Sequence, residues 1–135
     1  MMQKRWKSAF TLDEYQIRTS IEMKYFWTEA ERKRKHTTLC FEFQKGRYKG
    51  KCWLDDSLSL HADIFDKAGL YTLFRQAIPN FDYYYSSNIV TKENWQHLLA
   101  LAHQHGAEKK AIILELSPWV DDCFQTEEVF TICGI

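Results

Sequence analysis

The chain has 135 residues and no net charge; 45% of it is apolar, and nine Phe, seven Tyr and five Trp stand beside only two Pro and five Gly. This composition favours one folded domain over residues 1–135 and argues against a disordered or linker-rich chain. No apolar run reaches the ~18 residues of a membrane span, and no apolar stretch follows the basic start, so we expect no membrane contact and a cytoplasmic location.

The zero net charge hides two oppositely charged parts. Residues 1–51 hold 13 Lys and Arg against 6 Asp and Glu, whereas residues 52–135 hold 5 against 12. The first part therefore carries +7 and the second −7. Such asymmetry bears on partners rather than on fold. The alternative is that the two charges neutralise each other across the folded surface.

The first third of the chain fits helix and strand spacing about equally well. Ile21, Met23 and Tyr25 alternate with polar residues, and this favours a strand over residues 20–27. The basic stretch ERKRKH at 31–36 then reads as a loop or hairpin turn.

An antiparallel hairpin is predicted over residues 37–54. Its first strand, 37–44, alternates strictly, which is typical of a half-buried strand. One face would carry Leu39, Phe41 and Phe43, and the other Cys40, Glu42 and Gln44. KGRYKG supplies a turn, and KCWL at 51–54 reads as the returning strand.

Two helices are predicted in the middle of the chain. Residues 62–78 have the spacing of a helix with a wide buried face, weakened at Gly69 and ended by the proline that follows. Residues 91–105 repeat apolar side chains at helical spacing, with Thr91 as the cap and Gly106 as the stop.

The C-terminal part is less regular. Residues 107–116 fit either a strand or a helix, and Ser117-Pro118 reads as the cap and first position of a short helix over 118–124. EVFTICGI at 128–135 alternates as a final strand. The predicted fold is therefore an α+β domain, with a largely antiparallel sheet and two to four helices.

No motif of catalysis or cofactor binding is present. The sequence lacks the GxSxG, GxGxxG and GxxxxGK[ST] motifs. The histidines lack the i, i+4 spacing of a helical zinc site; they are His36, His61, His97, His103 and His105. The cysteines form no CxxC pair; they are Cys40, Cys52, Cys123 and Cys133. We expect free, buried thiols and no enzyme, metal, cofactor or small-molecule ligand. A small enzyme stays open as a third alternative, which turnover by the purified protein would reveal.

The basic N-terminal half suggests a nucleic-acid-binding domain as the alternative function. A basic run can neutralise phosphates, and aromatic rings can stack on bases. The residues concerned are those at 31–36, with Lys45, Arg47, Lys49 and Lys51, and the aromatic Trp6, Tyr25, Phe26 and Trp27. Charge runs are usually solvated faces, and the same aromatic rings can fill the core, so we expect nucleic acid not to be the partner.

The stretch NFDYYYSSN at 80–88 places three tyrosines among turn-forming residues. In an extended segment, Tyr83 and Tyr85 would face one way and Tyr84 the other. One set can then pack on the core while the other stands in solvent beside Asp82. Tyrosine is common in protein interfaces, because its ring is large and its hydroxyl can bond a partner. The alternative is a loop that lines the core.

Four stretches between residues 78 and 135 form a wider pattern: IPNFDYYYSS, TKENWQHLLALA, LSPWVDDCF and VFTICGI. This pattern resembles the immunity proteins of bacterial contact-dependent growth inhibition and related polymorphic toxin systems. It covers somewhat under half of the chain, and residues 1–60 add nothing to it.

The resemblance implies a small, cytosolic, non-catalytic protein that binds the C-terminal toxin domain of a cognate partner. Such toxins are often nucleases, whose basic clefts suit an acidic inhibitor. This chain departs from the pattern in its charge: inhibitors of nucleases are often acidic overall, whereas this chain is neutral. We expect the partner-binding residues to be Asp82, Tyr83, Tyr84 and Tyr85, with Asp55, Asp56, Asp121 and Asp122 as charged support.

Overall fold

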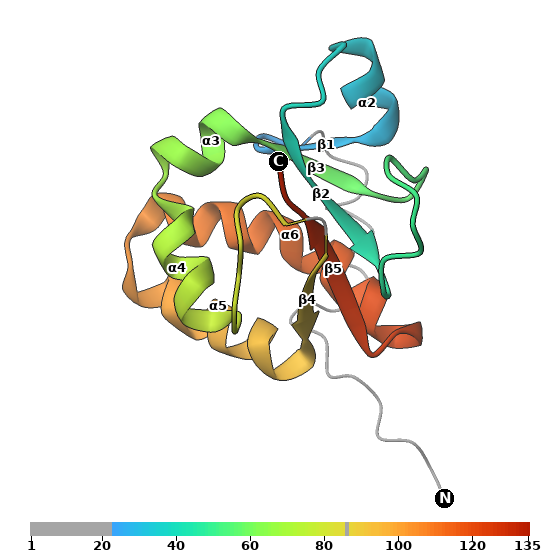
Figure 1. Cartoon of the computed structure of the whole chain (residues 1–135). Helices are drawn as coiled ribbons and strands as arrows, with labels where there is room; N and C mark the ends of the chain where they lie inside the picture. Colours follow the sequence, from blue (N-terminus) through green and yellow to red (C-terminus); the bar gives the residue numbers. More distant parts are fainter. Residues whose placement is uncertain (1–22, 86) are drawn as a thin grey trace, which may run out of the picture.

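The computed structural model describes residues 23–85 and 87–135, which form a five-stranded sheet in the order β1-β3-β2-β5-β4 (Figure 1). The strands are β1 (Phe26–Thr28), β2 (Cys40–Lys45), β3 (Leu58–His61), β4 (Asn88–Thr91) and β5 (Val129–Cys133). The helices are α2 (Glu29–Arg34), α3 (Ala62–Lys67), α4 (Leu70–Ala77), α5 (Lys92–Gln104) and α6 (Ala107–Thr126). All four strand pairings are antiparallel, so the predicted α+β class is confirmed.

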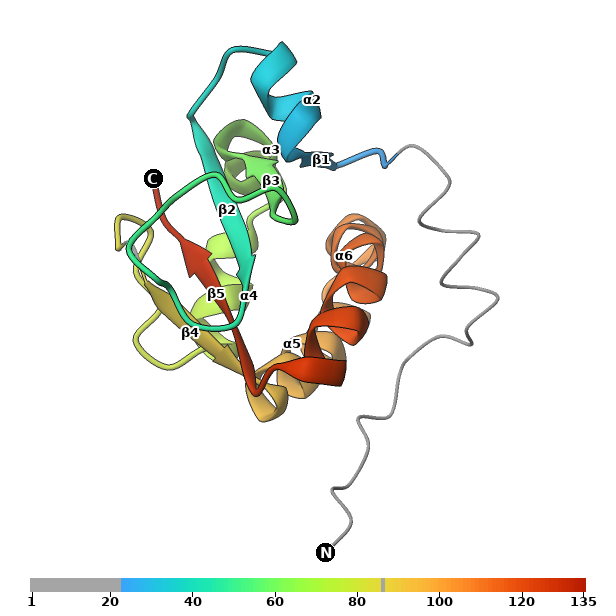
Figure 2. The ribbon, with the colours of Figure 1, turned by 90° about the vertical axis from the view of Figure 1, so that its right-hand side faces the viewer.

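One face of the sheet, called here the helix face, is apolar. Figure 2 shows α5 and α6 on this side, and rings from both helices meet Phe130 of β5. The face consists of Phe26, Phe41, Phe43, Leu58, Leu60, Val90, Phe130 and Ile132, all of them buried. It forms the centre of the hydrophobic core.

The other face, called here the polar face, is also buried. It carries Cys40, Glu42, Gln44, Ser59, Thr131 and Cys133. The loop 46–57 lies on this side of the sheet (Figure 2). The prediction that 37–44 is a half-buried strand is therefore wrong: β2 is buried on both faces because a loop covers the side whose alternation indicated solvent. Leu39, expected to point inward, precedes the strand and is exposed.

The hairpin predicted over 37–54 closes later than expected. Residues 51–54 are not a strand; β3 returns instead at Leu58–His61 and pairs with β2 through Phe43 and Leu58. The chain can turn between them because Gly46 and Gly50 adopt positive φ angles of 76° and 85°.

Two predicted helix boundaries are also wrong. The helix expected over 62–78 is divided into α3 and α4 by Gly69, whose φ is +70°. The short helix expected over 118–124 belongs to the continuous α6, with Pro118 inside it. Proline in a helix interior costs about 3 kcal/mol. The buried face of α6, from Ile112 to Phe124, outweighs this because each fully buried large apolar side chain contributes about 1.5–3 kcal/mol.

The N-terminal part differs from the prediction as well. The stretch 31–36, expected as a loop, lies largely in α2, which begins with a capping box between Thr28 and Glu31. Only 26–27 of the strand predicted over 20–27 lie in β1, and its first residues fall outside the described part of the chain. The helix predicted over 91–105 and the strand predicted over 128–135 are confirmed as α5 and β5.

None of the helices in residues 23–85 and 87–135 is long and apolar enough to cross a membrane.

Gly69→Ala should lower the free energy of unfolding by about 1–2 kcal/mol, because a left-handed backbone conformation is unfavourable for a residue with a Cβ. Gly69→Asn is the matched control, since asparagine tolerates this conformation better. Urea unfolding followed by circular dichroism measures both. An alanine variant as stable as the wild type would show that α3 and α4 do not require the left-handed turn.

Candidate functional site

The tyrosine loop, defined here as residues 79–85, follows α4 and precedes the edge strand β4. It is a turn and not the extended segment considered above. The Asp82 carboxylate accepts a hydrogen bond from the backbone N–H of Tyr84 at 2.8 Å, and the Asp82 carbonyl accepts one from Tyr85 N–H at 3.2 Å. The three rings therefore do not alternate between two faces as they would on a strand.

The buried side chain of Asn88 holds this turn closed. Its Oδ1 accepts from the backbone N–H of Asp82 at 2.9 Å. Its Nδ2 donates to the carbonyls of Asp82 and Ile132, both at 3.0 Å, and to that of Tyr85 at 3.3 Å. One amide thus ties both ends of the turn to β5.

The C-terminal residues fix the tyrosine loop from the other side. Gly134 N–H donates to the Tyr85 carbonyl at 2.6 Å, and Ile135 N–H donates to the Tyr83 carbonyl at 2.9 Å. A Cβ on Gly134 would lie only 2.3 Å from the Tyr83 carbonyl oxygen. The close approach therefore requires glycine at 134.

The three tyrosines differ in exposure. Tyr83 packs its ring edge-on against Phe41 and Phe65, at centroid distances of 4.9 and 5.8 Å. Its hydroxyl donates to Asp66 at 3.2 Å, and burial together with the Asp66 charge raises the pKa of Tyr83. Tyr84 and Tyr85 are 77% and 55% exposed.

Tyr71 of α4 extends this aromatic surface. It is 39% exposed, and its ring centroid lies 6.3 Å from that of Tyr83, which in turn lies 4.9 Å from that of Tyr84. We call these four tyrosines, with the exposed carboxylates Asp63, Asp66 and Asp82, the tyrosine patch. Sequence reasoning missed Tyr71 because it lay within the helix predicted to have a wide buried face. In α4 the buried residues are Leu70, Leu73, Phe74 and Ala77, and Tyr71 lies outside this set.

Of the predicted aspartates, Asp82 belongs to this patch, and the four that were expected as charged support do not. Asp122 of α6 pairs with Lys45, which lies opposite Phe130 near the start of β5, whereas the tyrosine loop meets the chain just after β5 ends. Asp121 is buried. Asp55 and Asp56 are exposed in the loop 46–57, and the Asp56 carbonyl accepts from the Trp119 indole N–H of α6 at 2.9 Å. The predicted charged support is therefore not assembled beside the predicted tyrosines.

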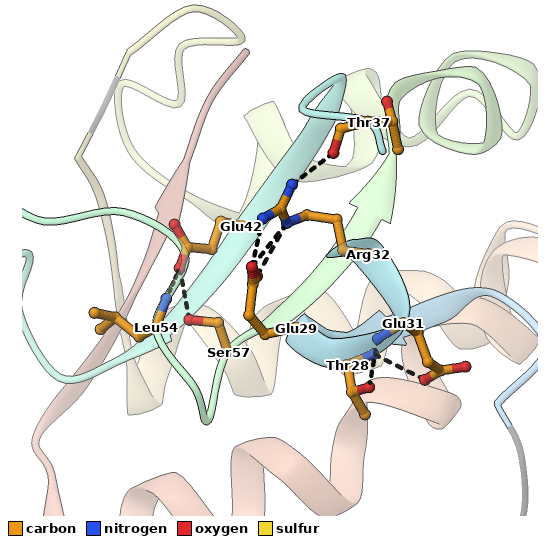
Figure 3. Close-up of polar contacts among 8 residues, drawn as sticks. All are labelled: Thr28, Glu29, Glu31, Arg32, Thr37, Glu42, Leu54 and Ser57. Atoms are coloured by element: carbon orange, nitrogen blue, oxygen red, sulfur yellow. Dashed lines mark hydrogen bonds and ion pairs between the residues drawn. The ribbon is translucent and has the colours of Figure 1, made fainter. Parts of the chain in front are cut away.

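The basic stretch 31–36 is partly structural. Arg32 is buried against Glu29: its Nε donates to both carboxylate oxygens at 3.1 and 3.0 Å, and its Nη1 donates to the Thr37 carbonyl at 2.7 Å (Figure 3). The Trp53 ring lies 4.0 Å from the guanidinium carbon, which attaches the loop 46–57 to α2.

The aromatic residues proposed for base stacking are also partly structural. Phe26 is buried in the core, so it cannot stack on a base. Trp27 is half-buried, and the Lys35 ammonium stands over its ring at 4.8 Å. Trp6 lies outside the described residues. The exposed cations that remain in this stretch and in the nearby loop are Lys33, Arg34, Lys35, Arg47, Lys49 and Lys51.

Glu42 is the centre of the polar face. Its Oε2 accepts from the Leu54 backbone N–H at 2.9 Å and from the Ser57 hydroxyl at 2.7 Å (Figure 3). Gln44 donates to the Lys51 carbonyl at 2.8 Å. These three bonds hold the loop 46–57 on the sheet.

The four cysteines differ in their exposure to solvent. All four are free thiols, and only Cys52 is exposed. Burial raises the pKa of Cys40 and Cys123 to about 11 and that of Cys133 to about 12. No three His, Cys, Asp or Glu side chains within the described ranges gather as metal ligands.

No family model matches the chain, and neither the curated proteins nor the solved structures contain a match.

Gly134→Ala should lower the free energy of unfolding by about 1–3 kcal/mol, because the new methyl group overlaps the Tyr83 and Tyr85 carbonyl oxygens. The tyrosine loop should then move away from the chain terminus. Amide hydrogen exchange at residues 134 and 135 measures this, with Ile135→Val as the control that keeps both backbone bonds. Unchanged protection in the alanine variant would contradict the arrangement.

Arg32→Ala should lower the free energy of unfolding by about 3–5 kcal/mol, because it leaves the Glu29 carboxylate buried without its partner. The double variant Glu29→Leu/Arg32→Leu removes both charges and should recover most of that loss. Lys33→Ala, at an exposed neighbour, should change stability by less than about 0.5 kcal/mol. Chemical denaturation distinguishes the three variants, and an equal effect of Arg32→Ala and Lys33→Ala would refute a buried pair.

Proposed function

We propose that this chain is an immunity protein, which binds the C-terminal toxin domain of a cognate partner one-to-one in the bacterial cytoplasm and neutralises it. The observation that carries the proposal is the tyrosine patch: neighbouring exposed rings on a loop fixed at both ends. Large exposed aromatic side chains are uncommon away from interfaces, and Tyr is enriched among the residues that dominate binding.

The rigidity of the loop supports a binding role. The Asn88 amide and the backbone bonds of Gly134 and Ile135 already order the loop in the free protein. A partner that contacts Tyr84 and Tyr85 therefore does not have to immobilise the loop backbone, and less binding free energy is lost to ordering.

Charge supports a basic partner. The patch includes the carboxylates of Asp63, Asp66 and Asp82, and two exposed cations stand beside them: Arg75, which donates to the Tyr71 hydroxyl at 3.3 Å, and Lys67, which follows Asp66 on α3. Carboxylates beside exposed rings complement a basic cleft such as that of a nuclease. The toxin in this proposal is therefore a nuclease, and the chain acts by occupying its surface without catalysis.

Tyr84→Ala and Tyr85→Ala should each weaken binding to the toxin domain by about 30-fold or more, which corresponds to the ~2 kcal/mol of a residue that dominates an interface. Leu39→Ala is the matched control, because Leu39 is also a large exposed apolar side chain but lies outside the patch. Isothermal titration calorimetry measures the affinities, and thermal unfolding checks that the variants are folded.

The toxin domain for this test is the C-terminal part of the protein encoded immediately upstream. Its inducible expression should stop growth, and co-expression of this chain should restore it. If Tyr84→Ala, Tyr85→Ala and Leu39→Ala all weakened toxin binding by the same factor, the assignment of the binding surface to the tyrosine patch would be wrong. An upstream product that is harmless, or that kills in the presence of this chain, would contradict the function, and salt-dependent binding of the chain to generic RNA or DNA would then favour the nucleic-acid alternative.

A further inference from the structure

The loop 46–57 brings one cysteine over another. Gln44 fixes Lys51 to β2, and Glu42 fixes Leu54, so Cys52 lies between two anchor points on the polar face. In the register of the sheet, Cys133 of β5 lies directly opposite Glu42. The loop therefore passes over Cys133 at the position of Cys52.

The contacts of the two thiols agree with this placement. Cys52 is among the neighbouring groups that raise the pKa of the Cys133 thiol, after burial and the Glu42 charge. The Tyr48 hydroxyl lies 3.9 Å from the Cys52 sulfur, on the same loop. Cys52 is exposed and Cys133 is buried beneath it, so a reagent from solvent meets Cys52 first.

The remaining cysteines are placed differently. Cys40 lies on the polar face opposite His61. It is two residues before Glu42, the residue of β2 that pairs with Cys133. Cys123 belongs to α6, where its thiol donates to the Val129 carbonyl at 3.5 Å. Neither contacts Cys52 in the arrangement described.

We propose that Cys52 and Cys133 are a thiol pair that reacts with a low-molecular-weight disulfide, such as oxidised glutathione, to form an intramolecular disulfide that fixes the loop 46–57 to β5. The thiol pair shares no residue with the tyrosine patch, and the proposal does not depend on toxin binding.

The reaction balances as two thiol–disulfide exchanges. The Cys52 thiolate attacks one sulfur of oxidised glutathione, which breaks its S–S bond and releases one glutathione thiolate. The Cys133 thiol then loses its proton to solvent, and its sulfur attacks the Cys52 sulfur of the mixed disulfide. The second glutathione leaves as a thiolate, and both glutathione thiolates take up a proton. The protein is oxidised by two electrons, and glutathione disulfide is reduced to two thiols.

The test uses the full chain, reduced and then incubated with oxidised glutathione at neutral pH. Peptide mapping without reduction, followed by mass spectrometry, should find a single linked pair of peptides, which contain Cys52 and Cys133. Trypsin should also cut the intact oxidised protein at Arg47, Lys49 and Lys51 at least several-fold more slowly than the reduced protein, because the disulfide keeps the loop on the sheet.

Two variants separate the steps. Cys133→Ala should accumulate glutathione on Cys52 without internal linkage, and Cys123→Ala should still form the Cys52–Cys133 link. The wild-type map needs no variant to fold and decides the proposal alone: glutathione that stays on Cys52, a link to Cys40 or Cys123, or a disulfide-linked dimer would overturn it.

Discussion

Strands β2 and β5 are buried on both faces, and each face requires a different kind of cover. The helix face is apolar and packs against α5 and α6 through the rings around Phe130. The polar face places the Glu42 carboxylate and the Gln44 amide in the interior, where unpaired groups of this kind are strongly unfavourable. The loop 46–57 bonds Glu42 Oε2 through Ser57 and Leu54, and Gln44 Nε2 through Lys51, so this irregular segment packs against the interior of the protein. Within the described residues, Glu42 Oε1 and Gln44 Oε1 are buried without a hydrogen-bond partner.

Strand β5 connects two separate sets of contacts. Near the start of β5, opposite Phe130, Lys45 and Asp122 pair; beyond its end, Gly134 and Ile135 bond the tyrosine loop. Asn88 couples this loop to β5 as well, through the Ile132 carbonyl. A change that shifts β5 therefore moves the tyrosine patch, although no residue of β5 belongs to the patch.

Prediction from sequence succeeded where one local signal controls the structure. The Thr91 cap and helical spacing defined α5, and alternation defined β5. It failed where tertiary packing decides: Pro118 signals a helix start, but the buried face of α6 extends through it. Strand β4 has only four residues, too few for a clear pattern. In the candidate site, the three tyrosines of the loop could be named from the sequence. The exposure of Tyr71 could not, because it depends on which side of α4 packs on the core.

The neutral net charge is compatible with the proposed basic partner, because a partner responds to the charge near the surface that it binds. Internal pairing neutralises Arg32 with Glu29 and Lys45 with Asp122. The exposed cations of α2 extend from the β1 edge of the sheet, and the tyrosine loop precedes β4 at the opposite edge. In the proposed complex, repulsion from the α2 cations would turn a basic partner toward the tyrosine loop and its Asp82. Asp63 and Asp66 lie nearer to these cations, on α3, which directly follows β3 beside β1. Orientation of this kind depends on the distribution of charge and not on its sum, so an inhibitor need not be acidic overall to direct its partner.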